Sequence, residues 1–301
     1  MIALNDLKIS YRIGTRTINA VDGVTLTIPD GCIVGVAGES GCGKSTLMKA
    51  IYGDIQSPMY LSGGSIDYGM KGQDGKPVTT ENIRREWFKS ISYIPQSSMN
   101  SLNPVIRIRD QFIDFPGTDS NKKRVLEVAR EYIGKLGLPP EAMDSYPHQL
   151  SGGMRQRVMI ALATFFKPGL IIADEPTTAL DVVVQKEILS LLMDVQEEMG
   201  NTILVVSHDM GVHYQVTHKM LIMYAGRVVE YGDTESVFAD PQHAYTKMLI
   251  DSLPTIGDDS MRGVLASMAG AGGDRAYRVE PGLVEVKPNH FVARPSAESS
   301  R

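Results

Sequence analysis

Short apolar runs alternate with helically spaced apolar positions along most of the chain. The run 33–37 ends in a glycine-rich loop, and a helical pattern follows from Lys44 onward. The runs 170–173 and 202–206 are continuous, as in strands of a sheet that is covered on both faces. This alternation predicts an α/β domain with a largely parallel sheet. The other predicted elements are a strand at 91–94 and helices at 121–138, 154–166 and 182–199.

Alternating polar and apolar positions mark a different kind of strand near the N-terminus. The segments 7–11 and 24–28 alternate, and the second of them runs into a turn at 29–31. A hairpin is also predicted from 221–224 and 227–231, which flank an Ala-Gly pair. We therefore expect antiparallel strands beside the parallel sheet.

The composition changes near residue 254. Residues 255–273 are rich in Gly, Ser, Ala and Asp, which predicts a linker. Residues 277–286 predict a small hairpin about Pro281-Gly282, and the last residues are expected to fray. We expect one domain over 1–254, and a linker with a short C-terminal extension over 255–301.

Composition and charge narrow the function classes. The net charge of −5 over 301 residues gives no global basic field, so we expect no nucleic-acid partner. The N-terminus lacks the layout of a signal peptide, and no apolar run reaches transmembrane length. Cys32 and Cys42 are the only cysteines, which argues against a disulfide framework and for a reducing compartment.

The glycine-rich loop after the first apolar run fits the G-x-x-x-x-G-K-[ST] pattern of a phosphate-binding loop. Its glycines let backbone N–H groups curl round a β-phosphate. Lys44 supplies a charge between the β- and γ-phosphates, and the Ser45 hydroxyl is a ligand for Mg²⁺. The predicted nucleotide-binding residues are Gly38, Ser40, Gly41, Cys42, Gly43, Lys44, Ser45 and Thr46.

Two carboxylates, Asp174 and Glu175, follow the apolar run 170–173. At a strand end the first can hold Mg²⁺ through water, and the second can polarise an attacking water. A solvated strand end is the alternative interpretation, and the phosphate loop elsewhere in the chain favours the catalytic one.

Two further polar residues follow predicted strands. His208 comes after the run 202–206 and could contact a γ-phosphate and the base Glu175, or be a loop histidine. Gln96 comes after the strand 91–94 and could reach Mg²⁺ or the attacking water, or face solvent. His148, His213, His218 and His243 lack such a context and are taken as structural, and no zinc-type spacing occurs.

Tyr11 and Cys42 each allow two interpretations. Tyr11 lies on an N-terminal strand near the phosphate loop, where its ring could stack on adenine or pack in the core. Cys42 lies within the phosphate loop at a helix N-terminus. That position could lower the pKa of its thiol and make it reactive. Alternatively, any small side chain serves there, because the backbone binds the phosphate.

A second glycine loop, Leu150-Ser151-Gly152-Gly153-Met154, lies far from the first and opens a helix. It offers a hydroxyl, unhindered backbone N–H groups and a positive helix end, which together form an anion site. The chain already carries a complete phosphate loop, so this second site requires its own explanation.

The ordered set of these motifs resembles the ATP-binding subunit of ABC transporters over residues 1 to about 250. The resemblance implies an ABC-type P-loop ATPase core with an N-terminal antiparallel β subdomain, and a helical subdomain at about 97–165. In the family the matching positions are the adenine-stacking loop, Walker A, Q-loop, signature, Walker B, D-loop and switch histidine. They fall here at Tyr11, Gly38–Thr46, Gln96, Leu150–Gln156, Asp174-Glu175, Ala179-Leu180-Asp181 and His208.

The resemblance also accounts for the second anion site. Two such subunits pair head to tail, so Ser151, Gly152 and Gly153 serve the partner's ATP, and Asp181 signals across the dimer. Glu175 acts on the water, and His208 holds the γ-phosphate. The implied cofactors are ATP and Mg²⁺. The implied partners are a second ATPase subunit, identical or homologous, two permease subunits and an extracytoplasmic solute-binding protein, with this chain peripheral on the cytoplasmic face of the membrane.

Four shorter segments of the sequence are similar to the oligopeptide/dipeptide importer branch of the family, which also contains importers of nickel and of oligosaccharides. These segments are residues 98–105, 174–182, 223–227 and 240–246. Members of this branch often carry a C-terminal cysteine cluster suited to an iron–sulfur site. This chain has no cysteine after Cys42, so we expect no such cluster. A non-transport ABC ATPase is the alternative, but the coiled-coil insertion or second ATPase unit of those classes is missing from the sequence.

Overall fold

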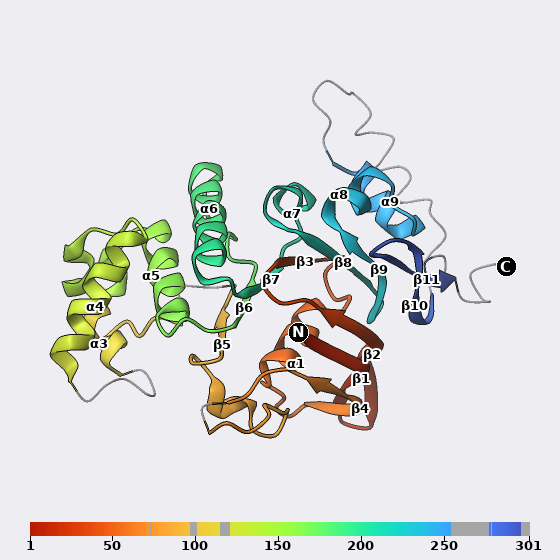
Figure 1. Ribbon diagram of the computed structural model, residues 1–301, viewed down its shortest axis with the longest axis horizontal. Helices are drawn as coiled ribbons and strands as arrows, with labels where there is room; N and C mark the ends of the chain where they lie inside the picture. The colour runs from red at the N-terminus through yellow and green to blue at the C-terminus, as the bar shows by residue number, and fades with distance from the viewer. Residues whose placement is uncertain (73, 97–100, 115–120, 254–276, 278, 296–301) are drawn as a thin grey trace.

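The computed structural model describes residues 1–72, 74–96, 101–114, 121–253, 277 and 279–295. Its largest element is an eight-stranded sheet with the strand order β10-β11-β9-β8-β3-β7-β6-β5 (Figure 1). The strands are β3 (Ile33–Ala37), β5 (Ile91–Ile94), β6 (Leu170–Asp174), β7 (Thr202–Val206), β8 (Lys219–Tyr224), β9 (Arg227–Asp233), β10 (Val279–Lys287) and β11 (His290–Pro295).

The five strands from β5 to β8 in this order run parallel to one another. Every residue of β3, β6 and β7 is buried, as their continuous apolar sequences predict for a sheet covered on both faces. Because the carboxyl ends of parallel strands share one edge, the loops after β3, β5, β6 and β7 meet there. That edge positions the candidate site.

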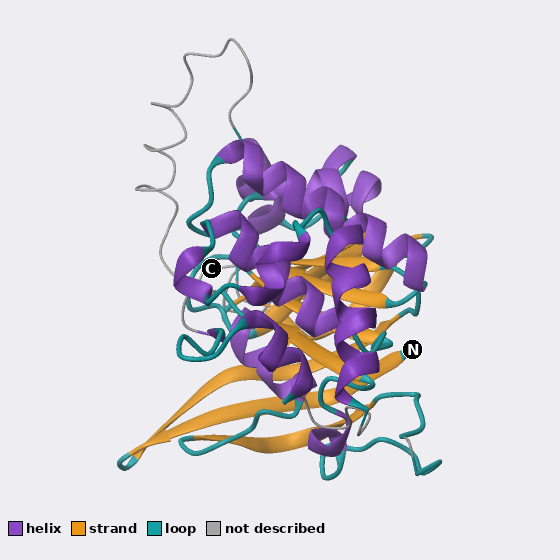
Figure 2. Ribbon diagram, turned by 90° about the vertical axis from the view of Figure 1, so that its left-hand side faces the viewer, coloured by secondary structure: helices purple, strands orange, loops and turns teal. Residues whose placement is uncertain are grey.

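A separate antiparallel sheet comprises β1 (Ile2–Ile13), β2 (Arg16–Ile28) and β4 (Met59–Asp67), in the order β2-β1-β4. In both views its long strands lie below the main sheet (Figures 1 and 2). Buried Ile9 and Val21 on these strands pack in one cluster with Leu47 and Ile51 of helix α1, Lys44–Tyr52. The predicted N-terminal antiparallel subdomain is confirmed.

Helices gather at the β5 end of the main sheet (Figure 1). Phe112, Ile133 and Val158, one from each of three helices, are fully buried in a shared core. These helices are α3 (Ile108–Ile113), α4 (Lys122–Lys135) and α5 (Gly152–Thr164), with short 3-10 turns at Pro140–Asp144 and Pro147–Gln149. The remaining helical elements are a 3-10 turn at Ile83–Glu86, α6 (Val182–Met199), α7 (Met210–Val216), α8 (Thr234–Ala239) and α9 (Ala244–Asp251).

The predicted C-terminal hairpin is present, but the predicted position of its turn was wrong. Strand β10 continues past Pro281-Gly282, where Gly282 has a φ of 94° and the pairing with β11 shifts register, and the hairpin turns instead at Pro288-Asn289, where Asn289 has a φ of 57°. A proline is tolerated on an edge strand such as β10, and asparagine tolerates the left-handed turn conformation. Part of the end expected to fray, residues 290–295, forms β11, which pairs with β9 at Phe291↔Tyr231, and residues 296–301 lie outside the described residues. The extension thus adds to the main sheet, and the predicted linker 255–273 lies outside the described residues.

Candidate functional site

A pocket of ≈ 470 Å³ lies at the carboxyl edge of the parallel strands. It brings together most of the residues that the sequence singled out, although they come from five separate parts of the chain. The lining consists of Tyr11, Ile18, Ala20, Ser40, Gly41, Gly43, Lys44, Ser45, Thr46, Gln96, Glu175 and His208.

The loop after β3 needs glycine for steric reasons. Gly38 has a φ of 146°, and a Cβ there would lie 2.2 Å from the Met223 carbonyl oxygen. Gly43 has a φ of 108°, and its Cβ would lie 2.3 Å from the Ala20 carbonyl oxygen. Only glycine fits both the conformation and the space, and α1 begins directly afterwards at Lys44. The loop therefore presents backbone N–H groups and a helix N-terminus to the pocket, which suits an anion.

Lys44 is buried, and its ammonium lies within the loop. Its Nζ donates hydrogen bonds of 2.7 Å to the carbonyl oxygens of Gly38 and Glu39. The Tyr11 hydroxyl lies 3.1 Å from Oγ1 of Thr46, and the half-buried Tyr11 both lines the pocket and packs against the core. The structure thus gives Tyr11 features of both interpretations.

Cys42 does not have the electrostatics of a reactive thiol. The residue is buried, and this burial raises the pKa of its thiol above the ordinary value. Lys44, whose Nζ lies 3.7 Å from Sγ, acts in the opposite direction but does not compensate. The hypothesis of a lowered pKa is therefore wrong, and the small size of the side chain remains as the reason for its place.

Glu175 is the centre of a group of polar side chains at the pocket. Its Oε2 accepts hydrogen bonds of 2.8 Å from Nε2 of Gln96 and from Oγ1 of Thr178. His208 Nδ1 lies 3.6 Å from its Oε1. Glu175 itself has a φ of 48°, and its N–H donates to the Val206 carbonyl at 2.9 Å. Such strain in a non-glycine residue is typical of functional sites. The sequence reasoning missed Thr178, which carries no signal beyond its place three residues after Glu175.

Asp174, at the end of β6, is buried and bonded to a tyrosine of the neighbouring strand. Tyr93 on β5 donates its hydroxyl to Oδ2 of Asp174 at 2.6 Å. Burial, and then the nearby carboxylate, raise the pKa of Tyr93, so the phenol stays a donor. The bond fixes one oxygen of Asp174 and orients the carboxylate. Sequence reasoning missed Tyr93, since only the pairing of β5 with β6 brings it close.

The second glycine loop lies apart from this pocket. Ser151 is exposed, and its hydroxyl caps α5 by accepting the Met154 N–H at 3.3 Å. A Cβ on Gly153 would lie 2.7 Å from Cγ1 of Val184, so the loop packs closely against α6. Asp181 caps α6 by accepting the Val184 N–H at 3.0 Å, and it too is exposed. The loop and Asp181 therefore present polar groups to solvent without contributing to the lining of the pocket.

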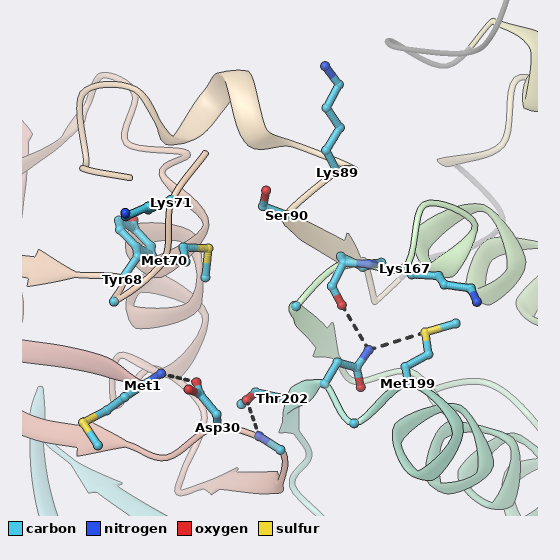
Figure 3. A pocket seen from close by; sticks show the side chains of 16 residues that line it. Met1, Asp30, Tyr68, Met70, Lys71, Lys89, Ser90, Lys167, Met199 and Thr202 are labelled. Carbon is cyan, nitrogen blue, oxygen red and sulfur yellow. Dashed lines mark hydrogen bonds and ion pairs between the residues drawn. The ribbon is translucent and has the colours of Figure 1, made fainter. Parts of the chain in front are cut away.

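A second cavity, of ≈ 450 Å³, lies near the amino ends of the parallel strands. Figure 3 shows Lys71, Lys89 and Lys167 around it, and the ion pair between the Met1 ammonium and Asp30 on one wall. None of the motif residues lines it. We therefore confine the candidate site to the carboxyl edge.

The comparisons with known proteins agree with this geometry. The profile of the ABC transporter family matches residues 21–178, and that of the oligopeptide/dipeptide transporter C-terminal region matches residues 229–274. The chain is 38% identical to the oligopeptide transport ATP-binding protein AmiE of Streptococcus pneumoniae over 90% of this chain and 76% of that protein. It is 36% identical to the dipeptide transport ATP-binding protein DppD of Escherichia coli over 98% of this chain and 88% of that protein.

Solved structures share the fold. The ATP-binding cassette MJ0796, determined as a dimer in a post-hydrolysis state with ADP and Pi, is 27% identical and superposes with a TM-score of 0.64. The match covers 78% of this chain and 99% of that cassette. CbiO1 of Clostridium perfringens, part of the transporter complex cbiONQ, is 26% identical with a TM-score of 0.64, over 79% of this chain and 90% of that one. Within the described residues, no helix has the length and apolar character needed to cross a membrane.

Proposed function

Because the chain belongs to the ABC transporter family of ATP-binding proteins, we propose that it powers an importer for oligopeptides or dipeptides by hydrolysing ATP. The observation that carries this proposal is the convergence of Gln96, Thr178 and His208 on the Glu175 carboxylate, beside the phosphate loop. Residues 1–254 form the ATPase domain in this proposal, with the linker and extension after it.

The geometry supports the following roles in this proposal. The phosphate loop 38–46 binds the ATP phosphates, Lys44 exchanges loop carbonyls for phosphate oxygens, and Tyr11 borders the adenine. Glu175 acts as the base toward the attacking water. Gln96 and Thr178 orient this carboxylate through their hydrogen bonds. His208 lies 3.6 Å from Glu175, and in this proposal it also contacts the γ-phosphate.

The donor chemistry fits Mg²⁺. Ser45, Asp174 and Gln96 offer a hydroxyl, a carboxylate and an amide oxygen. Oxygen ligands of this kind are the ones that Mg²⁺ prefers. The Tyr93 bond leaves one carboxylate oxygen of Asp174 available for a metal-bound water. Bound Mg²⁺ would neutralise charge on the phosphates.

The position of the second glycine loop, apart from the pocket, supports a mechanism that needs two ATPase subunits. Ser151, Gly152 and Gly153, at the start of α5, do not line the chain's own pocket. In our proposal they bind the ATP held by a second ATPase subunit, and Asp181 lies at the same interface. ATP closes the pair, and hydrolysis reopens it. Two permease subunits, served by a solute-binding protein, follow this motion while the chain stays peripheral on the cytoplasmic face.

Replacement of the proposed base tests the mechanism. Glu175→Gln should lower ATP hydrolysis by the assembled transporter at least a hundredfold while ATP binding persists, because the amide cannot accept the proton. Glu197→Gln, an exposed carboxylate of α6, is the matched control and should retain activity. Hydrolysis at the parental rate by Glu175→Gln would contradict the assignment.

The cargo is tested separately, since this subunit does not bind it in the proposed mechanism. The native complex should be purified with its solute-binding protein, and that protein assayed with peptides, oligosaccharides and Ni²⁺. Peptide binding is the expected result. Binding of only sugar or nickel would move the chain to another importer of the same branch.

A further inference from the structure

The segment 240–246 connects the C-terminal part of the chain to the phosphate loop. Tyr245, in the first turn of α9, is fully buried. Its hydroxyl accepts the backbone N–H of Glu39 at 2.8 Å, although the two residues lie 206 positions apart. A phosphate-loop N–H thus has its partner in α9, a helix that contributes no residue to the pocket lining.

The bond acts on the same peptide unit that Lys44 contacts. The peptide between Gly38 and Glu39 offers its C=O to Nζ of Lys44 at 2.7 Å and its N–H to Tyr245 at 2.8 Å. Since a trans peptide is planar with these two groups pointing in opposite directions, the unit is held from both sides. If the contact with Tyr245 is lost, this peptide unit can turn about the ψ bond of Gly38 and the φ bond of Glu39, and glycine restricts its own backbone least of all residues.

Tyr245 is in turn held by a chain of buried polar groups. His243 caps α9, its Nδ1 accepting the Tyr245 N–H at 3.2 Å. Oε2 of Glu230 accepts the backbone N–H of His243 at 2.9 Å. The other carboxylate oxygen of Glu230, Oε1, lies 2.6 Å from Nε2 of His290, on strand β11 of the C-terminal hairpin. The Tyr245 ring also packs on Tyr224, with ring centroids 4.7 Å apart.

We propose that Tyr245 is a positioning residue for the phosphate loop, and that the C-terminal hairpin supports it through His290, Glu230 and His243. The inference rests on the proposed function, since it takes ATP to be the ligand of that loop. Without the hydroxyl, the loop spends only a fraction of its time in the binding conformation, and the apparent affinity falls by that fraction. The loss of one such bond corresponds to about a five- to tenfold weaker ATP affinity.

Tyr245→Phe in the full chain tests this, because it removes the hydroxyl and keeps the ring. We expect the Kd for a fluorescent ATP analogue with Mg²⁺ to rise about five- to tenfold. In the assembled transporter, the KM for ATP should rise while kcat stays within about twofold. Tyr132→Phe is the matched control, since it removes a hydroxyl bonded to Oγ1 of Thr164 at 2.6 Å in the helical region. It should leave the ATP affinity unchanged.

Two further measurements keep the inference falsifiable if Tyr245→Phe folds poorly. His243→Ala removes the cap of α9 and should weaken ATP binding, whereas His243→Asn supplies another cap and should restore it. Exchange of the Glu39 amide hydrogen should be slow in the parental chain and faster in Tyr245→Phe. Parental ATP affinity and amide exchange in the variant would overturn the inference. If the parental chain itself fails to bind ATP, the proposed function falls, and amide exchange still decides whether the hydroxyl holds the loop.

Discussion

We expect Ser151 to have two separable roles, one in stability and one in ATP hydrolysis, and substitutions at this position test both. In the structure its hydroxyl caps α5, accepting the Met154 N–H at 3.3 Å. In the proposed dimer the same exposed hydroxyl faces the ATP of the partner. Ser151→Ala removes both contributions. Ser151→Asp keeps a good capping group but places a negative charge at the mouth of the anion site.

The magnitudes differ enough to be separated. Loss of the cap costs about 1 kcal/mol, which lowers the Tm of a chain of this size by about 2 °C. Aspartate caps as well as serine and gains from the helix dipole, so Ser151→Asp should melt at or above the parental temperature. Against a phosphate about 4 Å away, however, its charge costs about 4 kcal/mol at an effective dielectric of 20, which corresponds to nearly a thousandfold.

The assay combines thermal unfolding of the nucleotide-free chain, ATP binding by that chain, and ATP hydrolysis by the assembled transporter. We expect Ser151→Asp to be stable and to bind ATP normally through its own phosphate loop, yet to support little hydrolysis. Ser151→Ala should be slightly less stable and lose less activity. If Ser151→Asp hydrolyses ATP at the parental rate, the loop does not face a partner's nucleotide, and the half-site interpretation is refuted.

Three other perturbations follow from local geometry. Gly38→Ala should reduce ATP binding more than tenfold, because its Cβ would lie 2.2 Å from the Met223 carbonyl, whereas Gly41→Ala, with nothing within 4 Å, should cost less in the same binding assay. Burial lowers the pKa of His213 from 6.5 to about 4, so the unfolded chain binds the extra proton first. The free energy of unfolding should therefore fall by about 3 kcal/mol as the pH drops from 6.5 to 4. Denaturant titrations should show a smaller pH dependence of this free energy in His213→Gln. An equal pH dependence in that variant would contradict the assignment to His213. Cys42 should react with iodoacetamide more slowly than a free cysteine at pH 8, as followed by mass spectrometry, because burial raises the pKa of its thiol.

Elements whose pattern is local were predictable from the sequence. The bounds predicted for β3, β5, α6 and β7 agree with the structure. Each is a short apolar run or an amphipathic repeat. Glycine follows β3, proline follows β5, and α6 begins after the capping Asp181 and ends at Gly200. The phosphate loop was predictable for the same reason, since its glycines and Lys44 are adjacent in sequence and each is needed for a local conformation or charge.

Predictions failed where distant parts of the chain decide the outcome. Pro281-Gly282 looks like a turn, but β10 continues past it through a register shift and pairs with β11 again from Leu283 onward. A helix N-terminus favours a reactive Cys42, but the packing around it removes water and reverses the direction of the pKa shift.

The sequence by itself determined the family, the phosphate loop and the polar residues that follow the parallel strands. Each of these is recognised from a short motif of residues adjacent in the chain. Only the tertiary structure decided which side chains hold them. Tyr93 on Asp174 and Tyr245 on the Glu39 N–H are hydrogen bonds between residues far apart in the chain. Buried polar groups must find partners, and the packed fold determines which partners are within reach.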